Sequence, residues 1–341
     1  MSDQTRAMVL AAGLGTRLRP VTWSIPKPMV PVMNRPVMEH ILRLLAGHGF
    51  ERVVANLHWF PDVIEDWFGD GSRAGVELQY SHEPALLGTA GGVRNAAGLL
   101  GDEFLVISGD ALTDIDLTRM KEFHRSHDGI ATLATRRVED TSGFGVVITD
   151  ESGRIQGFQE KPSPDEALSD LANCGIYIFD SAIFDFFPGP GESGLAGPED
   201  PESFADWAYD VFPALLESGE PFYSHEVEAY WNDIGTIPEM LKGNFDGLRG
   251  LISLDPGVPQ RSEGLWIPES FDAAGIEIEG PVLIGEGAEV GEGSSLTGPL
   301  VVGSDCRVGS GARLREAVLT DGASIEDGGY LVGGVAGVAS S

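Results

Sequence analysis

Residues 8–20 read MVLAAGLGTRLRP, a short apolar run that gives way to glycines and arginines. A continuous apolar run such as the one over 7–12 is typical of a strand buried on both faces of a sheet. Gly13 and Gly15 follow it at once, and a glycine lets backbone amides approach a phosphate with no Cβ in the way. The stretch therefore predicts a buried strand that ends in a phosphate-binding loop.

The alternation continues through roughly the first 130 residues, where apolar runs are separated by amphipathic stretches. We expect further strands at 52–57, 76–80 and 104–107, and helices at 37–45, 63–68 and 89–100. Strands that alternate with helices form a mainly parallel sheet with helices on both faces. From Gly143 the pattern becomes hairpin-like, with strands at 144–148, 154–158 and 175–179, so we expect an α/β fold with a mixed sheet.

The C-terminal part of the sequence has a different period. Aliphatic residues recur every six positions: Ile278, Ile284, Val290, Leu296, Val302, Val308 and Leu314. A period of six fits neither a helix nor a simple strand, and it is typical of a hexapeptide β-helix in which three hexads make one coil. We therefore expect a short left-handed β-helix over 264–341, a linker over 251–263, and the α/β domain over 1–250.

The charge and composition of the chain exclude several classes of protein. Of 341 residues, 53 are acidic and 22 basic, and the resulting net charge of -31 argues against nucleic acid or an anionic membrane as partner. Two cysteines, Cys174 and Cys306, rule out a disulfide framework and a multi-cysteine zinc site. No apolar run approaches the roughly 18 residues of a membrane span, and the N-terminus lacks a signal layout, so we expect a soluble cytoplasmic protein.

The glycine loop differs from the two common nucleotide-binding loops. A dinucleotide-binding fold would need a third glycine at position 18, where this chain has Leu18. A Walker-type loop would need Gly-Lys-Ser/Thr after four spacers, which this stretch lacks. The loop instead carries Arg17 and Arg19, and Lys27 follows between two prolines that fix an extended backbone around it.

These features resemble the signature of the sugar-1-phosphate nucleotidyltransferases, also called nucleotide-sugar pyrophosphorylases. The family's motifs occur in order: AAGLGTRLRPVT with PKPM, EPALLGTAGG at 83–92, ISGDAL at 107–112, FQEKP at 158–162, NCGIYIF at 173–179 and WNDIGT at 231–236. The resemblance covers residues 6–247 and is nearest to mannose-1-phosphate guanylyltransferase-like members. It implies a Rossmann-like sheet and transfer of a nucleotidyl group from an NTP to a sugar 1-phosphate, with release of pyrophosphate.

The resemblance also assigns roles around the glycine loop. It implies three catalytic residues: Arg17, Lys27 and Asp110. It implies that the nucleotide is bound by Leu10, Ala11, Ala12, Gly13, Gly15, Thr16, Arg17, Glu83, Gly88, Thr89 and Asp110. These residue types suit the reaction, because two polyanions must be aligned and their repulsion cancelled. An arginine can clamp a triphosphate through two hydrogen bonds, and a fixed lysine can stabilise charge on the α-phosphate.

For the sugar phosphate and the metal, the resemblance implies two further sets of residues. The sugar-phosphate set is Gly145, Glu160, Lys161, Asn173 and Gly175. The carboxylate of Glu160 and the amide of Asn173 can form hydrogen bonds with sugar hydroxyls, and Lys161 can neutralise the sugar phosphate. The metal set is Asp110 and Asp233, two oxygen ligands of the kind that Mg²⁺ accepts when phosphates and waters supply the rest.

Glu83 bears on the identity of the base. An ionised carboxylate only accepts hydrogen bonds, and guanine presents two adjacent donors, whereas uracil and thymine present one donor between two carbonyls. We therefore favour GTP, with mannose 1-phosphate as acceptor by the family resemblance. The motif EPALLGTAGG has one residue more than in guanylyl relatives, so the register of Glu83 stays open. Glucose-1-phosphate thymidylyl-, uridylyl- or adenylyltransferase and cyclitol-phosphate nucleotidyltransferase are the alternatives.

Two other classes of protein compete with this reading. Hexapeptide β-helices often belong to acyltransferases, which use a histidine base, but the histidines at 40, 48, 58, 82, 124, 127 and 225 all precede the repeats. A regulatory paralogue that binds a nucleotide sugar without turnover should have lost a catalytic cation or metal carboxylate, and this chain keeps them. The open end of so few coils needs cover, which predicts a homo-oligomer.

Overall fold

The computed structural model describes residues 5–195 and 202–337 of the chain. Within them, two compact units are distinguished by their internal contacts. The first consists of Met1–Leu14, Ile41–Ala111 and Ile115–Trp231, and the second of Gly15–His40, Leu112–Asp114 and Asn232–Ser341. The glycine loop therefore divides between the units after Leu14, and the division into domains at 250 stays a prediction.

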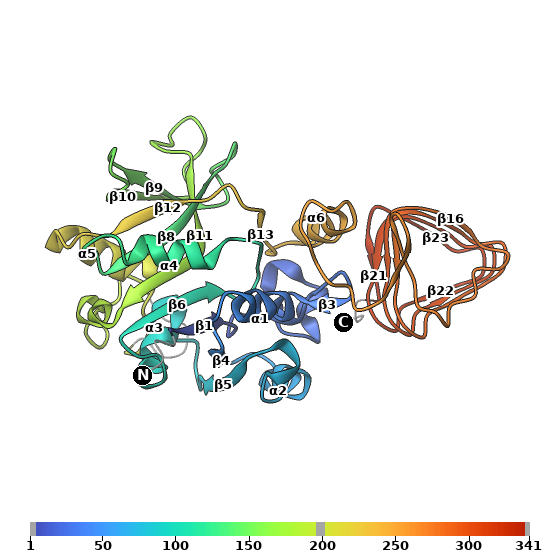
Figure 1. Ribbon diagram of the computed structural model, residues 1–341, viewed down its shortest axis with the longest axis horizontal. Coiled ribbons are helices and arrows are strands. Elements are labelled where there is room, and N and C mark those ends of the chain that lie inside the picture. Colours follow the sequence, from blue (N-terminus) through green and yellow to red (C-terminus); the bar gives the residue numbers. More distant parts are fainter. Residues whose placement is uncertain (1–4, 196–201, 338–341) are drawn as a thin grey trace. The chain divides into compact units, whose positions relative to one another are not determined.

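The first unit is built on one mixed sheet (Figure 1). At its centre, β1 (Arg6–Leu10) runs parallel to β4 (Arg52–Leu57) on one side and to β6 (Glu103–Ser108) on the other. β5 (Glu77–His82) continues the parallel part beyond β4, and β11 (Leu171–Asp180) lies antiparallel beside β6. The predicted strands at 52–57 and 104–107 and the mixed character of the sheet are thereby confirmed.

The outer part of the sheet contains the predicted hairpin and two strands that the sequence pattern did not indicate. β9 (Gly145–Thr149) and β10 (Ile155–Glu160) are antiparallel, as the turn at 151–153 predicts. β8 (Ala131–Arg137) pairs with β11, and β12 (Tyr223–Glu226) runs parallel to β8. Both additional strands lie next to residues far away in the sequence, which a local pattern does not register.

Helices connect strands in both units, and the last of them lies in the second unit. Their bounds are α1 (Val37–Gly47), α2 (Pro61–Phe68), α3 (Gly88–Asn95), α4 (Leu117–His124), α5 (Phe212–Ser218) and α6 (Ile237–Leu248). α3 contacts β1, and α4 contacts β8, β11 and β12. Among the residues that the structure describes, no helix is long and apolar enough to cross a membrane.

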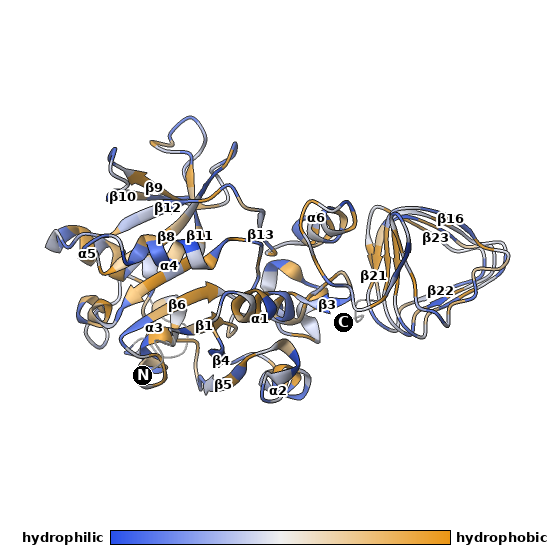
Figure 2. Cartoon of the chain, in the orientation of Figure 1, coloured by the Kyte–Doolittle hydropathy of each residue, from blue (hydrophilic) through white to orange (hydrophobic). Residues whose placement is uncertain are grey.

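The core of the first unit explains why its central strands read as uninterrupted apolar runs. Met8, Val106 and Phe104 are fully buried, and Figure 2 shows these strands as predominantly hydrophobic. Aromatic side chains extend the core, with the rings of Phe179 and Trp207 stacked at 4.6 Å. At roughly 25 cal/mol per Å² of buried apolar surface, such a core fixes the position of the strand ends that carry polar residues.

The second unit is rich in short strands. It contains β2 (Pro31–Val32), β3 (Arg35–Pro36), β14 (Gln260–Ser262), β15 (Leu265–Trp266), β16 (Glu277–Glu279), β17 (Val282–Ile284), β18 (Glu289–Val290), β19 (Ser295–Val302), β20 (Arg307–Val308), β21 (Arg313–Leu319), β22 (Ser324–Ile325), β23 (Tyr330–Val332) and β24 (Val335–Ala336). β7 (Ala111–Thr113) and β13 (Trp231–Asp233) are the remaining strands.

From β16 onward, the strands pair in parallel, at a spacing of three hexads as far as Arg315 and of one residue less beyond it. Glu277 pairs with Ser295, and Ser295 pairs with Arg313. The predicted in-phase aliphatic residues form the core of this region, with Ile284, Leu296, Val302, Val308 and Leu314 buried and Ile278 and Val290 packed against them. The glycines that follow them face the next layer of backbone: a Cβ on Gly309 would lie 2.4 Å from the Asp327 nitrogen. Close stacking therefore requires glycine at this position.

Candidate active site

The carboxyl ends of β1 and β6 bring the start of the glycine loop, up to Leu14, and Asp110 to one edge of the sheet in the first unit. Leu10 and Ser108 are register partners, and the Gly109 N–H donates to the Leu10 carbonyl. Asp110 follows directly and is 9% exposed. Ligand groups in open α/β sheets gather at this edge, so Asp110 lies where such a sheet presents them, and its catalytic role stays a prediction.

Asn56, near the end of β4, connects the segments at this edge and belongs to none of the motifs quoted above. Its Oδ1 accepts from the Ala11 N–H at 2.8 Å, and its Nδ2 donates to Glu83 Oε1 at 2.7 Å. Glu83 Oε2 accepts from the Leu87 N–H at 3.2 Å. The signal that could have revealed Asn56 is one polar residue inside the buried stretch VVANL of this strand.

The surroundings of Glu83 differ from those expected of a carboxylate open to a base. Glu83 is 5% exposed, and each of its oxygens has a protein donor. Burial raises the pKa of Glu83, while the bonds from Asn56 and Leu87 oppose that change. The carboxylate is thus part of the scaffold of this edge.

Gly88 and Thr89, at the start of α3, contact a later part of the chain. Gly88 has φ of 80°, and a Cβ there would lie 2.4 Å from the Ala205 carbonyl oxygen. The Thr89 hydroxyl donates to Asp206 Oδ2 at 2.8 Å and accepts from the Trp207 N–H at 3.2 Å. The side chain of Thr89 is therefore engaged within the protein, and its role in nucleotide binding stays a prediction.

In the second unit, three of the predicted residues come together. Lys27 Nζ lies 3.7 Å from Asp233 Oδ1. Burial lowers the pKa of Lys27; the negative charge of Asp233 opposes this, and the positive charge of Arg17 adds to it. Arg17 also borders the turn after Asp233, because a Cβ on Gly235 would lie 3.1 Å from the Arg17 Nη2 atom. Two cations and one carboxylate thus share one location.

Gly15 shapes the backbone around this cluster. Its φ is 60°, and the Thr22 hydroxyl donates to its carbonyl oxygen at 2.7 Å. A Cβ on Gly15 would lie 3.0 Å from both the Lys27 Cβ and the Thr22 Cγ2 atoms. Gly13, in the first unit, has no neighbour within 4 Å of a Cβ, so open space adjoins it. Thr16 and Arg17 begin a short 3-10 helix.

The predicted sugar-phosphate residues converge at the outer strands of the first unit. Glu160 lies opposite Gly145 in the β9–β10 register, and its carboxylate pairs with Lys161 Nζ at 2.8 Å. A Cβ on Gly145 would lie 3.1 Å from Glu160 Oε2, so the glycine and the carboxylate are close neighbours. Ala172 of β11 pairs with Val146, so the next residue, Asn173, lies beside the same strand end.

Asn173 and Gly175 form an irregularity in β11 that faces the end of β6. The Asn173 side chain accepts from the Gly175 N–H at 3.0 Å and donates to the Tyr177 hydroxyl at 3.0 Å. Gly175 has φ of 69°, and a Cβ there would lie 2.8 Å from the Ser108 Oγ. The residue two positions after Ser108 is Asp110, so the structure places the Asn173–Gly175 turn close to the predicted catalytic carboxylate.

Comparison with known proteins agrees with these motifs. A family model described as nucleotidyl transferase matches residues 6–248. The chain belongs to the nucleotidyl transferase family. It is 40% identical to a UTP--glucose-1-phosphate uridylyltransferase of Synechocystis sp., over 84% of this chain and 76% of that protein. It is 35% identical to a mannose-1-phosphate guanylyltransferase of Mycobacterium tuberculosis, over 96% of this chain and 83% of that protein.

A solved structure supports the α/β fold. HddC from Yersinia pseudotuberculosis, crystallised with GMP-PN, superposes with a TM-score of 0.58 at 24% identity. The match covers 70% of this chain and 98% of that chain. The mixed sheet with its helices is therefore a fold that this chain shares with HddC.

Nucleotidyl transferases of this family generally use a divalent metal. Asp110 and Asp233 provide carboxylate oxygens, the donors that hard cations prefer. Asp110 belongs to the first unit and Asp233 to the second, so their joint binding of one ion stays a prediction. Both carboxylates suit a divalent cation by their chemistry. Asp233 is also accessible to one, because 34% of its side chain is exposed beside Lys27.

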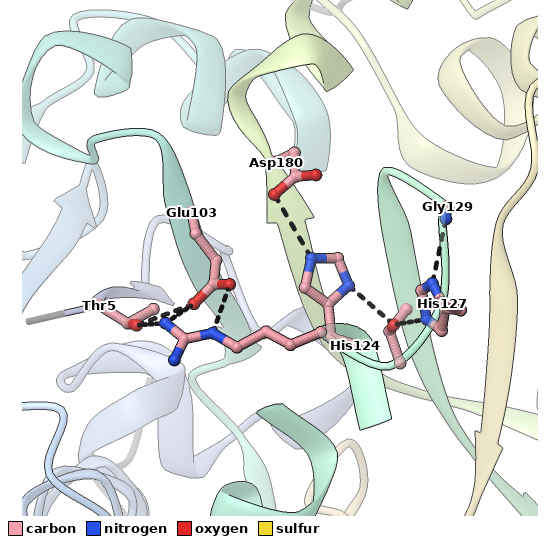
Figure 3. A network of polar contacts seen from close by, with 8 residues as sticks. Thr5, Glu103, His124, His127, Gly129 and Asp180 are labelled. Atoms are coloured by element: carbon pink, nitrogen blue, oxygen red, sulfur yellow. Dashed lines mark hydrogen bonds and ion pairs between the residues drawn. The ribbon is translucent and has the colours of Figure 1, made fainter. Parts of the chain in front are cut away.

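Another group of possible ligands lies at the opposite edge of the sheet. Within residues 5–195 and 202–337, Glu103, His124 and Asp180 are the one cluster whose ligand atoms lie within 4.8 Å of one another. Figure 3 shows that these atoms already have protein partners. Arg125 donates to both oxygens of Glu103 at 2.9 and 2.8 Å, and His124 Nδ1 meets the Thr132 hydroxyl at 2.9 Å. The cluster is a structural network at the start of β6, away from Asp110.

Proposed function

We propose that this protein is an enzyme that transfers a nucleotidyl group from a nucleoside triphosphate to a sugar 1-phosphate. The observation that carries the proposal is the grouping of Arg17, Lys27 and Asp233 at one location in the second unit. Two fixed cations beside a partly exposed carboxylate suit a triphosphate with its counterion. Family membership over residues 6–248 supports the same reaction class.

The proposed reaction is a substitution at the α-phosphorus. An oxygen of the sugar phosphate forms a bond to that phosphorus as the bond to the bridging oxygen of the β-phosphate breaks, and the electron pair leaves with pyrophosphate. Arg17 would hold the triphosphate, and Lys27 would neutralise charge that builds up on the α-phosphate in the transition state. A Mg²⁺ ion held by Asp110 and Asp233 would reduce the repulsion between the two anions and stabilise the leaving pyrophosphate.

On the acceptor side, the first unit supplies polar groups of the right kind. Lys161 would neutralise the sugar phosphate, while Glu160 and Asn173 would bond to sugar hydroxyls. Gly145 and Gly175 would let the sugar approach the backbone closely. Holding the acceptor in this way converts a bimolecular reaction between anions into an aligned one, which is worth several kcal/mol of the barrier.

For the substrates we favour GTP and mannose 1-phosphate. A relative named mannose-1-phosphate guanylyltransferase, aligned over 96% of this chain, supports this choice. UTP and glucose 1-phosphate are the second candidate pair, because the uridylyltransferase relative is 40% identical. Among the proposed site residues, none distinguishes mannose from glucose by its chemistry alone.

A matrix of substrates tests the proposal. Five nucleoside triphosphates are combined with several sugar 1-phosphates in the presence of Mg²⁺, and pyrophosphate release is measured. We expect turnover with at least one pair, and GTP with mannose 1-phosphate as the best. A best rate with UTP and glucose 1-phosphate would select the second candidate, and no release with any pair would favour a nucleotide-sugar sensor.

Three further features are part of the proposal. We infer that the strand-rich C-terminal region is a left-handed β-helix, supported by the parallel pairing at three-hexad spacing. We also infer that copies associate as a homo-oligomer, because a β-helix of few coils needs a neighbour to cover it. A cytoplasmic location is proposed from the substrate, since nucleoside triphosphates are available in that compartment.

A further inference from the structure

A buried polar chain connects three segments at the carboxyl edge of the first unit. It runs from the Ala11 N–H to Asn56 Oδ1, from Asn56 Nδ2 to Glu83 Oε1, and from the Leu87 N–H to Glu83 Oε2. Asn56 is 3% exposed and Glu83 is 5% exposed. Such groups are costly to bury, so a complete set of partners is required to keep them there.

The polarity of this chain is fixed by its two ends. The Ala11 and Leu87 N–H groups are donors, so each needs an acceptor. Asn56 must therefore present its oxygen to Ala11 and its amide nitrogen to Glu83, and Glu83 must accept at both oxygens. Rotating the Asn56 amide by a half-turn would oppose donor to donor at Ala11 and acceptor to acceptor at Glu83.

A glycine leaves the space that the pair occupies. A Cβ on Gly92, within α3, would lie 2.5 Å from Glu83 Oε1 and 2.6 Å from Asn56 Nδ2. The helix that begins within the EPALLGTAGG motif therefore rests directly on the hydrogen bond between the two side chains. The pair, the helix and the ends of β1 and β4 form one connected arrangement within a single unit.

We propose that Asn56 and Glu83 are positioning residues that set the spacing between the glycine loop and the 83–92 segment for the nucleotide. This inference rests on the proposed function, in which those two segments bind the nucleotide. Glu83 then affects the choice of nucleotide through the backbone at Leu87 and Gly88, and its carboxylate accepts no hydrogen bond from the base. The Ala11 N–H is likewise committed to Asn56, so Ala11 contributes through its place in the loop.

The decisive experiment reverses the polarity of the pair. Asn56→Asp alone brings two carboxylates together, and Glu83→Gln alone provides one oxygen where two donors need acceptors. In the Asn56→Asp/Glu83→Gln double variant, the carboxylate at 56 accepts from Ala11 and from the amide at 83, whose oxygen accepts from Leu87. Every hydrogen bond of the chain is restored and the net charge is unchanged.

We expect each single variant to raise the KM for the nucleotide by roughly tenfold or more, the loss expected for one hydrogen bond to a charged group. The double variant should return to within about threefold of wild type, because the strength of the network depends on its completeness. The KM for the sugar 1-phosphate should stay unchanged in all three. Relative use of GTP and UTP should return with the double variant as well.

Two outcomes would overturn the inference. If Glu83 reads the base directly, the double variant keeps the altered base preference of Glu83→Gln. If the pair only stabilises the fold, the single variants lower the melting temperature while the nucleotide KM stays at the wild-type value. Gly92→Ala provides a second probe, because it displaces the pair without changing its chemistry, and it should also raise the nucleotide KM.

Failure of the proposed function is separable from failure of this inference. Binding of GTP and UTP is measured by calorimetry on the full chain without sugar phosphate, for wild type and all variants. If wild type binds a nucleotide without turnover, the transferase proposal fails, and the same cycle on Kd still tests the pair. Loss of affinity in the singles without recovery in the double would refute the positioning role.

Discussion

Lys27 shows how one side chain serves two environments. Its ammonium group is largely buried, and its position is fixed between two prolines and beside Asp233. Burial without substrate lowers its pKa, and the phosphates of a bound nucleotide would favour its charged form. We predict that Lys27→Ala lowers kcat by about 10²- to 10³-fold, the loss typical for removing one preorganised charge-stabilising group.

The measurement is pyrophosphate release at saturating substrate, together with a melting curve that checks the fold. Lys121→Ala is the matched control, because Lys121 lies over the Phe50 ring at 5.2 Å, away from the proposed site. It should leave turnover unchanged and cost about 0.5–1 kcal/mol of unfolding free energy at most. A decrease of less than about threefold for Lys27→Ala would remove this residue from the catalytic set.

Gly13 and Gly15 give a second prediction, since the two glycines are required for different reasons. Nothing lies within 4 Å of a Cβ on Gly13, so Gly13→Ala should leave stability intact and raise the nucleotide KM by crowding the phosphates. Gly15 has φ of 60°, so Gly15→Ala should destabilise the protein by about 1–2 kcal/mol or more. Melting temperature and nucleotide KM are measured on both variants. Gly13→Ala should change mainly the KM, and Gly15→Ala should lower the melting temperature. Equal destabilisation by both would contradict this distinction.

At the residue level, the sequence predicts which residues belong to the candidate site better than it predicts how they are arranged. Arg17, Lys27 and Asp233 were expected from motifs that lie far apart in the chain, and the structure brings them together. Asn56 was not expected, because one asparagine in a strand has no motif around it. Asn56 matters because it accepts from the Ala11 N–H and donates to Glu83, which in turn accepts from the Leu87 N–H. These partners are neighbours only in the tertiary structure.

At the level of elements, local patterns succeed where the environment is uniform. The strand at 52–57 agrees with β4 at both ends, because a parallel strand buried on both faces is mainly apolar. β8 and β12 were missed, and Thr132 and Thr135 show the reason. Both threonines are fully buried in β8 with side-chain partners, so the run ATLATRR does not read as a core strand.

The element that ends at His124 carries a directed hydrogen-bond chain (Figure 3). The Gly129 N–H donates to His127 Nδ1 at 3.1 Å, so that nitrogen has no proton and Nε2 carries it. His127 Nε2–H then donates to the Thr132 hydroxyl at 2.8 Å, and Thr132 donates to His124 Nδ1 at 2.9 Å. The remaining His124 Nε2–H points to Asp180 at 3.5 Å. Both imidazoles must be neutral for this chain to exist.

A pH dependence of stability follows from this chain. Burial lowers the pKa of His124 and lowers that of His127 to about 4, from ordinary values of 6.5. The folded state thus binds fewer protons than the unfolded state. The contribution of these two histidines to the free energy of unfolding is therefore fully present above pH 6.5 and decreases as the pH falls toward 4. Urea unfolding at several pH values should show about one proton fewer taken up on unfolding in His127→Gln than in wild type. Equal slopes for the two proteins would contradict the chain.

At the scale of the whole molecule, the two parts of the sequence differ in how predictable they are. The six-residue period identified the repeats of the C-terminal region, because each layer is packed against a copy of itself. The division into compact units was not predicted: contacts separate Gly15–His40 from Met1–Leu14, although the sequence reads both as one loop motif. Such a boundary depends on contacts between distant segments, which periodicity does not encode.

The charge of the whole molecule leads to the last prediction. With 53 acidic and 22 basic residues, one-to-one pairing leaves 31 negative charges in excess. Exposed ion pairs, such as Arg137 with Glu226 at 2.7 Å, contribute only about 0–1 kcal/mol each, so repulsion among the excess acids should dominate. Raising NaCl from about 0.01 M to 1 M shortens the screening length from roughly 30 Å to 3 Å, and we expect the melting temperature to rise. KCl at equal ionic strength should give the same rise, whereas sucrose tests for a non-ionic effect. A melting temperature that falls with salt would show that ion pairs outweigh the repulsion.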